Sequence, residues 1–214
     1  MKKLVLQMQI SVDGFVAGPN GELDWVFITI DEATTDWIVE RLWQAEVHIM
    51  GRRTFQDMAS YWPTSTEPYA APMNEIPKVV FTEKGFTMSQ KVELTTEVQD
   101  ASRAREKRGE ADSSTRPASA ESWDEATVVT GHLADEIVEL KRQAGKDILA
   151  HGGAGFAQAL VSLGLLDEYR LIVHPVALGR GLPLFSPLSK PLDLELVSST
   201  AFKGGSVAQV YSPA

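Results

Sequence analysis

The chain has 214 residues, of which 43% are hydrophobic and 23% are charged, as is ordinary for a packed globular protein. It contains no cysteine, which excludes a disulfide framework, thiolate catalysis and cysteine-based zinc or iron–sulfur sites. Its net charge of −9 opposes binding to phosphate backbones, so nucleic-acid binding is not expected. A small polyanionic ligand would need a local basic cluster, which makes the position of each arginine informative.

The N-terminal segment is not expected to be a signal peptide or a membrane anchor. Two lysines precede apolar residues, but Gln7, Gln9 and Asp13 interrupt the apolar run too early for a signal peptide. No window approaches the 18 consecutive apolar residues typical of a membrane span. We therefore expect a cytoplasmic protein.

The first half of the chain alternates predicted strands and helices. Residues 3–10 predict a buried strand, and turns follow at 11–14 and 18–21. Apolar side chains recur at helical spacing over residues 32–45, with Asp31 as the N-cap. A short strand over residues 47–50 runs through Gly51 into another helix. A proline-rich connection then precedes a strand over residues 78–82.

The second half continues the alternation and ends in a hairpin. The pattern predicts helices over residues 133–143 and 156–163, strands over 147–150 and 169–174, and a hairpin formed by 194–202 and 207–211. Such an order is typical of a mixed sheet covered by helices. Residues 97–122 have almost no large apolar side chains and predict a mobile surface insertion with a helical turn, or alternatively a lid over a pocket.

Two strand-to-helix junctions are candidate anion sites. In the first, Gly51-Arg52-Arg53-Thr54, free N–H groups at the helix N-terminus and two guanidinium groups suit a phosphate. The alternative is a glycine turn followed by a solvated basic pair. The second junction, residues 151–157, reads HGGAGFA, and its adjacent glycines would let a ligand approach the main chain.

The second junction does not match the common nucleotide-binding fingerprints. Gln158 stands where a Rossmann G-x-G-x-x-G motif needs Gly or Ala. No ribose-binding acid follows about 20 residues later, and no G-K-[ST] completes a P-loop. His151 borders this junction, where a strand-end histidine bonded to the backbone is the alternative to a functional role.

Six motifs, in order, carry a resemblance to a known family: SVDGFVA, LDW, IMGRRTF, KVVFT, DILAHGGAGF and PVALGRGLPLF. This ordered set resembles the dihydrofolate reductase-like superfamily, most closely proteins similar to the C-terminal reductase domain of the riboflavin-biosynthesis deaminase-reductase. The resemblance spans nearly the whole chain. It implies one α/β domain over residues 1–214, with a mixed, mostly parallel central sheet flanked by helices and a C-terminal antiparallel hairpin. Relatives of this kind commonly pair as homodimers.

The resemblance also implies that the chain binds NADPH. Arg52 and Thr54 match positions that face the 2′-phosphate and neighbouring phosphates. Gly152 and Gly153 match a glycine pair, often joined by a cis peptide, that faces the pyrophosphate. The implied cofactor-binding residues are Gln9, Ile10 and Ala17 around the nicotinamide, Gly51, Arg52, Arg53 and Thr54 at the first junction, Thr82 beside the adenine ribose, and Gly152, Gly153, Ala154, Gly155 and Phe156 at the second junction.

The substrate half of the site is less closely matched. Asp36 is the candidate catalytic acid, because it lies one residue from the position where dihydrofolate reductases place a carboxylate that protonates and holds the pterin. The alternative is an exposed helical acid. Trp25 and Trp37 are candidates for stacking on a flat substrate, with core packing as the alternative. No two histidines are spaced i, i+4 on a helix, so no metal site is predicted.

These observations predict an NADPH-dependent oxidoreductase. Its small-molecule substrate would be a planar heterocycle, pterin- or pyrimidine-like, or a related C=N or C=O compound. A non-catalytic NADPH- or nucleotide-binding or regulatory module on the same fold is the alternative. A hydrolase is disfavoured because no G-x-S-x-G elbow is present.

Overall fold

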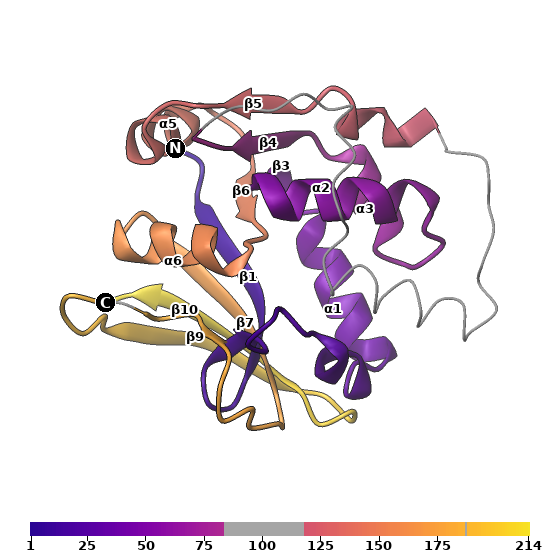
Figure 1. Ribbon diagram of the computed structural model, residues 1–214, viewed down its shortest axis with the longest axis vertical. Helices are drawn as coiled ribbons and strands as arrows, with labels where there is room; N and C mark the ends of the chain where they lie inside the picture. The colour runs from indigo at the N-terminus through magenta and orange to yellow at the C-terminus, as the bar shows by residue number, and fades with distance from the viewer. Residues whose placement is uncertain (84–117, 187) are drawn as a thin grey trace.

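The computed structural model describes residues 1–83, 118–186 and 188–214 (Figure 1). The strands within these ranges are β1 (Leu4–Ser11), β2 (Phe15–Ala17), β3 (Ala45–Gly51), β4 (Lys78–Phe81), β5 (Thr127–Val129), β6 (Asp147–Ala150), β7 (Glu168–His174), β8 (Leu182–Pro183), β9 (Leu194–Ala201) and β10 (Val207–Pro213). The main sheet has the order β5-β4-β3-β6-β1-β7-β10-β9, and β2 pairs separately with β8.

The main sheet is mostly parallel. Neighbouring strands from β5 to β7 run parallel, whereas β10 is antiparallel to both β7 and β9. This is the mixed sheet with a C-terminal antiparallel hairpin that the sequence predicts. The carboxyl ends of parallel strands share one edge of a sheet, where ligands of α/β proteins usually bind.

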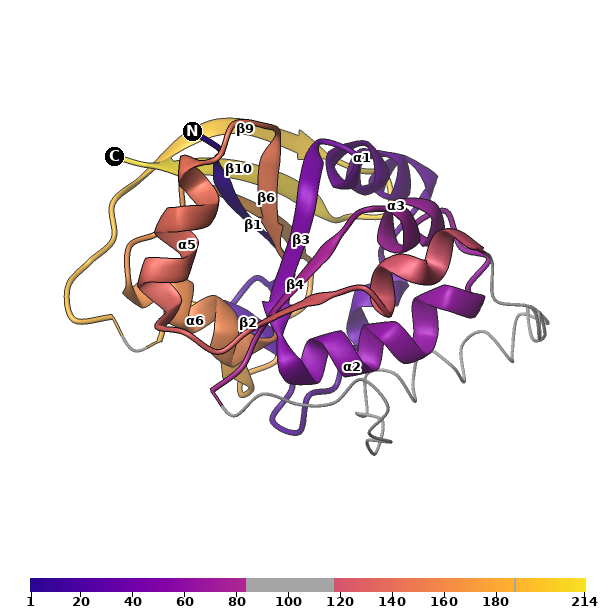
Figure 2. The same ribbon diagram turned by 90° about the horizontal axis from the view of Figure 1, so that it is seen from above.

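Helices cover both faces of the sheet (Figure 2). They are α1 (Glu32–Leu42), α2 (Arg52–Tyr61), α3 (Ala70–Glu75), α5 (Leu133–Arg142) and α6 (Ala154–Ser162), with 3₁₀ turns η1 (Asp24–Ile28), η2 (Trp62–Thr64) and η3 (Ala118–Trp123). Successive strand side chains point to opposite faces. Leu6 therefore packs in the core beneath α5 and α6, and Val5 in the core beneath α1, α2 and α3. None of the helices in the described ranges has the length and apolar character needed to cross a bilayer.

The start of α1 is capped as the sequence predicts. The Asp31 carboxylate accepts hydrogen bonds from the Thr34 amide at 2.8 Å and from the Gly204 amide at 2.7 Å. The cap therefore also ties α1 to the turn between β9 and β10. The predicted end of this helix at Ala45 is wrong, because α1 stops at Leu42 and Ala45 already begins β3.

The C-terminal end of the predicted insertion is packed into the fold. Residues 118–122 belong to η3, where Ala120 is fully buried and the Ser122 hydroxyl accepts a hydrogen bond from Lys78 Nζ at 2.7 Å. The expectation of a mobile segment up to Ser122 is therefore wrong at this end. The predicted helical turn, the lid alternative and the rest of the insertion as far as residue 117 lie outside the described residues.

Lys78 is a buried cation that joins β4 to η3. The side chain is 2% exposed, and its ammonium group also donates to the Ile76 carbonyl and lies 4.4 Å from the centre of the Trp123 ring. Burial lowers the pKa of Lys78 to about 7, because an apolar surrounding disfavours the charged form.

This burial makes the free energy of unfolding depend on pH. Between pH 7 and the ordinary lysine pKa of 10.5, the unfolded chain binds one more proton at this site than the folded chain. Stability therefore rises with pH across this window, with a slope of at most about 1.4 kcal/mol per pH unit. Urea unfolding at several pH values should show this slope in the wild type and a flatter curve in Lys78→Met. Identical slopes would contradict the lowered pKa of Lys78 in the folded chain.

Candidate functional site

Two helix N-termini meet at the edge of the sheet where the parallel strands end. β3 leads into α2 at Gly51, and the adjacent strand β6 leads into α6 through Gly152 and Gly153. The Gly153 amide donates to Thr54 Oγ1 at 2.5 Å, and the Gly51 amide donates to the Gly152 carbonyl at 3.2 Å. The two predicted anion sites, about a hundred residues apart in sequence, therefore form one continuous surface.

This surface is suited to an anion because both helices begin without a side-chain cap. Gly51 and Gly153 are the N-cap residues, and no side-chain hydrogen bond caps either helix within the described ranges. The first N–H groups of such helices are ready donors to a phosphate, and the helix dipole favours negative charge there.

The glycine pair keeps side chains out of this surface. Gly152 has φ +89°, which L side chains rarely adopt, and a Cβ atom there would lie 3.1 Å from Met8 Sδ. A Cβ atom at Gly153 would lie 3.0 Å from Thr54 Oγ1. A ligand can therefore approach the main chain at a place where a larger residue would collide with its neighbours. The Gly152–Gly153 peptide bond is cis, as the resemblance implies.

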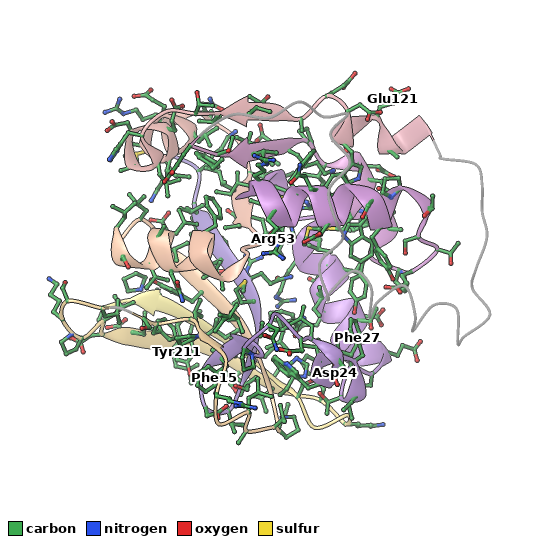
Figure 3. The ribbon with its side chains drawn as sticks, in the orientation of Figure 1. Phe15, Asp24, Phe27, Arg53, Glu121 and Tyr211 are labelled. Carbon is green, nitrogen blue, oxygen red and sulfur yellow. The ribbon has the colours of Figure 1, made fainter. Side chains whose placement is uncertain are left out.

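Other residues predicted to bind the cofactor lie at the same edge. Phe81 pairs with Gly51, and its ring stacks on Phe156 of α6 at a centroid distance of 5.4 Å. Thr82 follows Phe81, so it lies beside the first junction. Arg52 is half-buried, whereas Arg53 is exposed and extends from the start of α2 toward the start of α6 (Figure 3).

A pocket of about 320 Å³ adjoins the junction on the face of the sheet covered by α1, α2 and α3. The junction contributes Thr54, Gly153 and Ala154 to its lining, and most of the wall is apolar, including side chains from η1 and α1. Phe27 of η1 lines the pocket while remaining 45% exposed. Such a lining suits a mostly apolar, flat ligand with a few polar anchor points.

Gln9 is a polar group of this pocket whose orientation is fixed from behind. His174 is fully buried, and burial lowers its pKa to about 4, so the ring is neutral at physiological pH. Its Nε2 lies 2.7 Å from Gln9 Oε1, and its Nδ1 lies 2.6 Å from Thr29 Oγ1. A carbonyl oxygen only accepts, so Nε2 donates to Gln9 and Nδ1 accepts from Thr29. The Gln9 amide nitrogen remains available to the pocket.

Of the predicted nicotinamide positions, Gln9 and Ala17 line the pocket and Ile10 does not. The Ile10 side chain is buried in the core on the opposite face of the sheet. This follows from strand alternation, because Gln7 and Gln9 share one face of β1 and Ile10 belongs to the other.

The candidate catalytic acid is corrected by the structure. Asp36 is exposed on α1 and does not line the pocket, which matches the alternative of an exposed helical acid. The pocket carboxylates are Asp57, which is 4% exposed on α2, and Glu67. Glu67 accepts a hydrogen bond from the Tyr61 hydroxyl at 2.5 Å. The acids that could reach a substrate therefore come from α2 and the segment after it.

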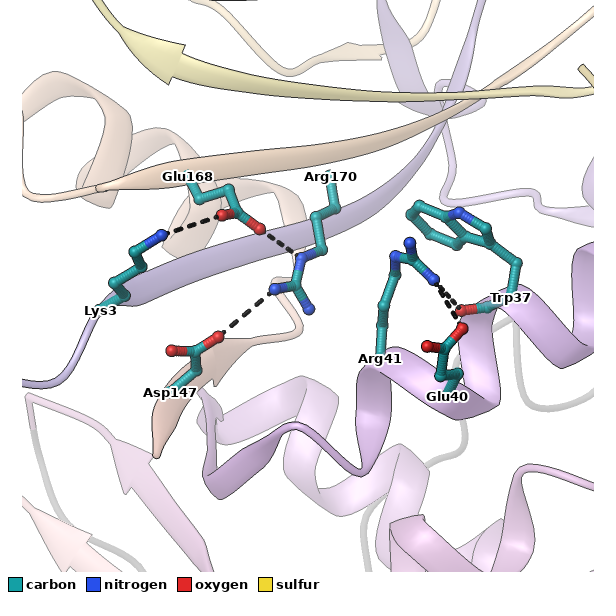
Figure 4. Close-up of polar contacts among 7 residues, drawn as sticks. All are labelled: Lys3, Trp37, Glu40, Arg41, Asp147, Glu168 and Arg170. Carbon is teal, nitrogen blue, oxygen red and sulfur yellow. Dashed lines mark hydrogen bonds and ion pairs between the residues drawn. The ribbon is translucent and has the colours of Figure 1, made fainter. Parts of the chain in front are cut away.

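The two candidate stacking tryptophans are also corrected, because both belong to the core and neither lines the pocket. The Trp25 ring packs edge-on against His174 at 5.4 Å. The Trp37 ring lies under the Arg41 guanidinium, whose central carbon is 3.8 Å from the ring centre (Figure 4). The same ring also packs edge-on against Phe202. The tryptophan that lines the pocket is Trp62, in the turn after α2.

Sequence reasoning missed several pocket residues. Among them, Gln7 had a visible signal. Together with Gln9, which the sequence did predict, it forms a pair of polar residues, spaced by two, in an otherwise apolar central strand, a pattern that indicates a polar patch on one buried face. Asp57, Tyr61 and Trp62 gave no comparable signal, because their direction depends on how α2 sits against the sheet. Within the described ranges, no cluster of three or more His, Asp or Glu side chains could hold a metal ion.

Comparison with known proteins assigns the family. Residues 2–208 match the family model of the RibD C-terminal domain. The chain belongs to this family. It is 30% identical to the Bacillus subtilis protein YyaP over 210 residues, covering 98% of this chain and 94% of YyaP.

Solved structures show the same fold at low sequence identity. The Thermotoga maritima diaminohydroxyphosphoribosylaminopyrimidine deaminase/5-amino-6-(5-phosphoribosylamino)uracil reductase aligns with a TM-score of 0.63 and 17% identity, over 100% of this chain and 57% of that one. Enterococcus faecalis dihydrofolate reductase, solved in complex with NADP(H), aligns with a TM-score of 0.56 and 13% identity, over 99% and 96% of the two chains. The fold is therefore dihydrofolate reductase-like and related to the riboflavin-biosynthesis reductase domain, as the sequence motifs predicted.

The contact between the two junctions can be tested by its effect on stability. Thr54→Val keeps the shape of the side chain but removes the acceptor of the Gly153 amide. It should lower the free energy of unfolding by about 1–2 kcal/mol, the cost of leaving a partly buried N–H group unsatisfied. Thr54→Ser retains the acceptor and serves as the matched control. Urea unfolding that gives equal stabilities for the two variants would contradict the contact.

Proposed function

We propose that this protein is an NADPH-dependent reductase of a small planar substrate containing a C=N or C=O group. The hydrogen bond from the Gly153 amide to Thr54 Oγ1 is the main support, because it joins two uncapped helix N-termini into one anion-binding surface beside an apolar pocket. The membership of the RibD C-terminal domain family agrees with a reductase. In a protein of negative net charge, this local arrangement of donors supports the proposal that a dinucleotide's phosphates bind here.

The residues present fit NADPH. The phosphates would be held by the N–H groups at the starts of α2 and α6, with Arg52, Arg53 and Thr54 as side-chain donors. The glycine pair leaves room for the close approach of the main chain. Gln9 and Ala17 line the pocket beside the junction, where a nicotinamide ring would extend. The cofactor, when bound, supplies the hydride.

The protein's own part in the reaction would be to orient the substrate and to exclude water. The apolar wall formed by η1, α1 and α3 would shield the ring from solvent and fix its plane. Asp57 and Glu67 line the same pocket, so they replace Asp36 as candidate sources of the proton that accompanies a hydride.

The proposed activity is tested by two measurements on the purified protein. NADPH titration should quench or shift the cofactor fluorescence, and a panel of pterins, pyrimidinones and quinones should include a compound that oxidises bound NADPH. Binding without oxidation across the panel would favour a non-catalytic NADPH-binding module instead. Failure to bind NADPH would contradict both.

Selection of NADPH over NADH should depend on the basic pair at the start of α2. Arg52→Ala should weaken NADPH much more than NADH, because only NADPH carries the 2′-phosphate that a guanidinium can grip. The same measurement on Arg53→Ala shows how much the second guanidinium contributes to the preference for NADPH over NADH. Arg142→Ala, at the exposed C-terminal end of α5, removes the same charge elsewhere and should leave both affinities unchanged. Equal losses of NADPH and NADH in Arg52→Ala would refute its role.

A further inference from the structure

Gln7 and His151 are two neighbouring pocket residues with unsatisfied polar atoms. Both line the pocket, and Gln7 Oε1 and His151 Nε2 are buried without a hydrogen-bond partner among the described residues. Gln7 belongs to β1, and His151 directly follows the adjacent parallel strand β6. The residues before them, Leu6 and Ala150, are paired in the sheet. Buried polar groups are nearly always hydrogen-bonded, so an exception needs an explanation, and functional sites are where such exceptions are expected.

The ring of His151 adds polarity to this patch without charge. Burial, together with the charge of Lys78, lowers the pKa of His151 to about 3. Its ring also packs edge-on against His48, with centroids 4.5 Å apart, and burial holds the pKa of His48 well below 6.5. The sheet side of the pocket therefore presents neutral groups: the amides of Gln7 and Gln9 and the imidazole of His151.

The remainder of the lining disfavours an anionic substrate. No lysine or arginine occurs among the described residues that line the pocket, whereas Asp57 and Glu67 do. Among these described lining residues, a phosphate or carboxylate on the substrate would find no cationic partner. The aromatic rings of Tyr61, Trp62 and Tyr69 also line the pocket, and such rings pack well against a flat heterocycle.

A side-chain amide has a natural complement in a lactam. Gln7 can turn its carbonyl or its NH₂ group toward the pocket, because the terminal amide torsion is broad and two-fold. Its carbonyl accepts from a ring N–H and its NH₂ donates to the adjacent ring C=O, so one amide reads both groups at once. The Gln9 NH₂ group, fixed by His174, supplies a further donor to a second ring carbonyl.

We propose that the pocket binds an uncharged lactam ring without a phosphate group, recognised by the amide of Gln7 with His151 beside it. This inference rests on the proposed reductase function and specifies its substrate class. The Thermotoga maritima protein that shares the fold is named for a phosphoribosyl substrate. The pocket of this chain instead selects a neutral, unphosphorylated ring.

The test uses fluorescent lumazine, a bicyclic lactam, at mildly acidic pH where the ring is uncharged. Lumazine is titrated into the full-length protein in the presence of NADP⁺, and lumazine-6-carboxylate and uridine 5′-monophosphate serve as the charged probes. Gln7→Leu should weaken lumazine binding by about tenfold, the loss expected for one paired amide. Lumazine should bind the wild type at least tenfold more tightly than either charged probe.

Thermal unfolding separates this role from a structural one. Because Gln7 Oε1 has no described partner, Gln7→Leu should unfold at the same or a higher temperature than the wild type while binding lumazine less well. A lower melting temperature with unchanged lumazine affinity would overturn the inference, as would tighter binding of either charged probe. NADPH titration of the wild type distinguishes a failure of the substrate class from a failure of the proposed reductase function. If NADPH binds and lumazine does not, the substrate class is wrong; if NADPH also fails, the proposed function is wrong.

Discussion

The hydrogen bond between the Gly153 amide and the Thr54 hydroxyl is the interaction on which the site depends. It holds the start of α6 against the start of α2, so that two uncapped helix N-termini share one surface. Each terminus alone is a weak anion site, and the contact places two such sites side by side. The protein carries a net charge of −9, so such local convergence is needed to offset the repulsion of an anionic ligand.

The central sheet places the other half of the site beside this contact. β6 lies between β3 and β1, which brings His151 and the glycine pair next to the two glutamines of β1. Alternation along β1 then divides its side chains, with Gln7 and Gln9 facing the pocket and Ile10 entering the opposite core. The charged network of Lys3, Asp147, Glu168 and Arg170 lies at the starts of β1, β6 and β7 (Figure 4). The amino ends of these strands therefore carry ion pairs, and their carboxyl ends carry the pocket.

Prediction from sequence succeeded where the signal was local. Glycines at strand ends, Asp31 as a cap and the ordered motifs indicated the strands, both junctions and the fold family. Prediction failed where a side chain's direction depends on tertiary packing. Asp36, Trp25 and Trp37 have the right chemistry for a substrate site, but Asp36 lies on the solvent side of α1, Trp37 packs under Arg41, and Trp25 packs against His174. η3 was missed for a related reason, because Lys78 holds this small-residue segment through contacts that no local pattern reveals.

A crystal structure of the protein with NADPH is the most direct test of whether the starts of α2 and α6 form one phosphate site. Pyrophosphate density is expected between the starts of α2 and α6, within hydrogen-bonding distance of the amides around Gly153, with the nicotinamide beside Gln9 and Ala17. Well-ordered NADPH density at another surface, or a structure in which Thr54 and Gly153 are separated, would contradict it.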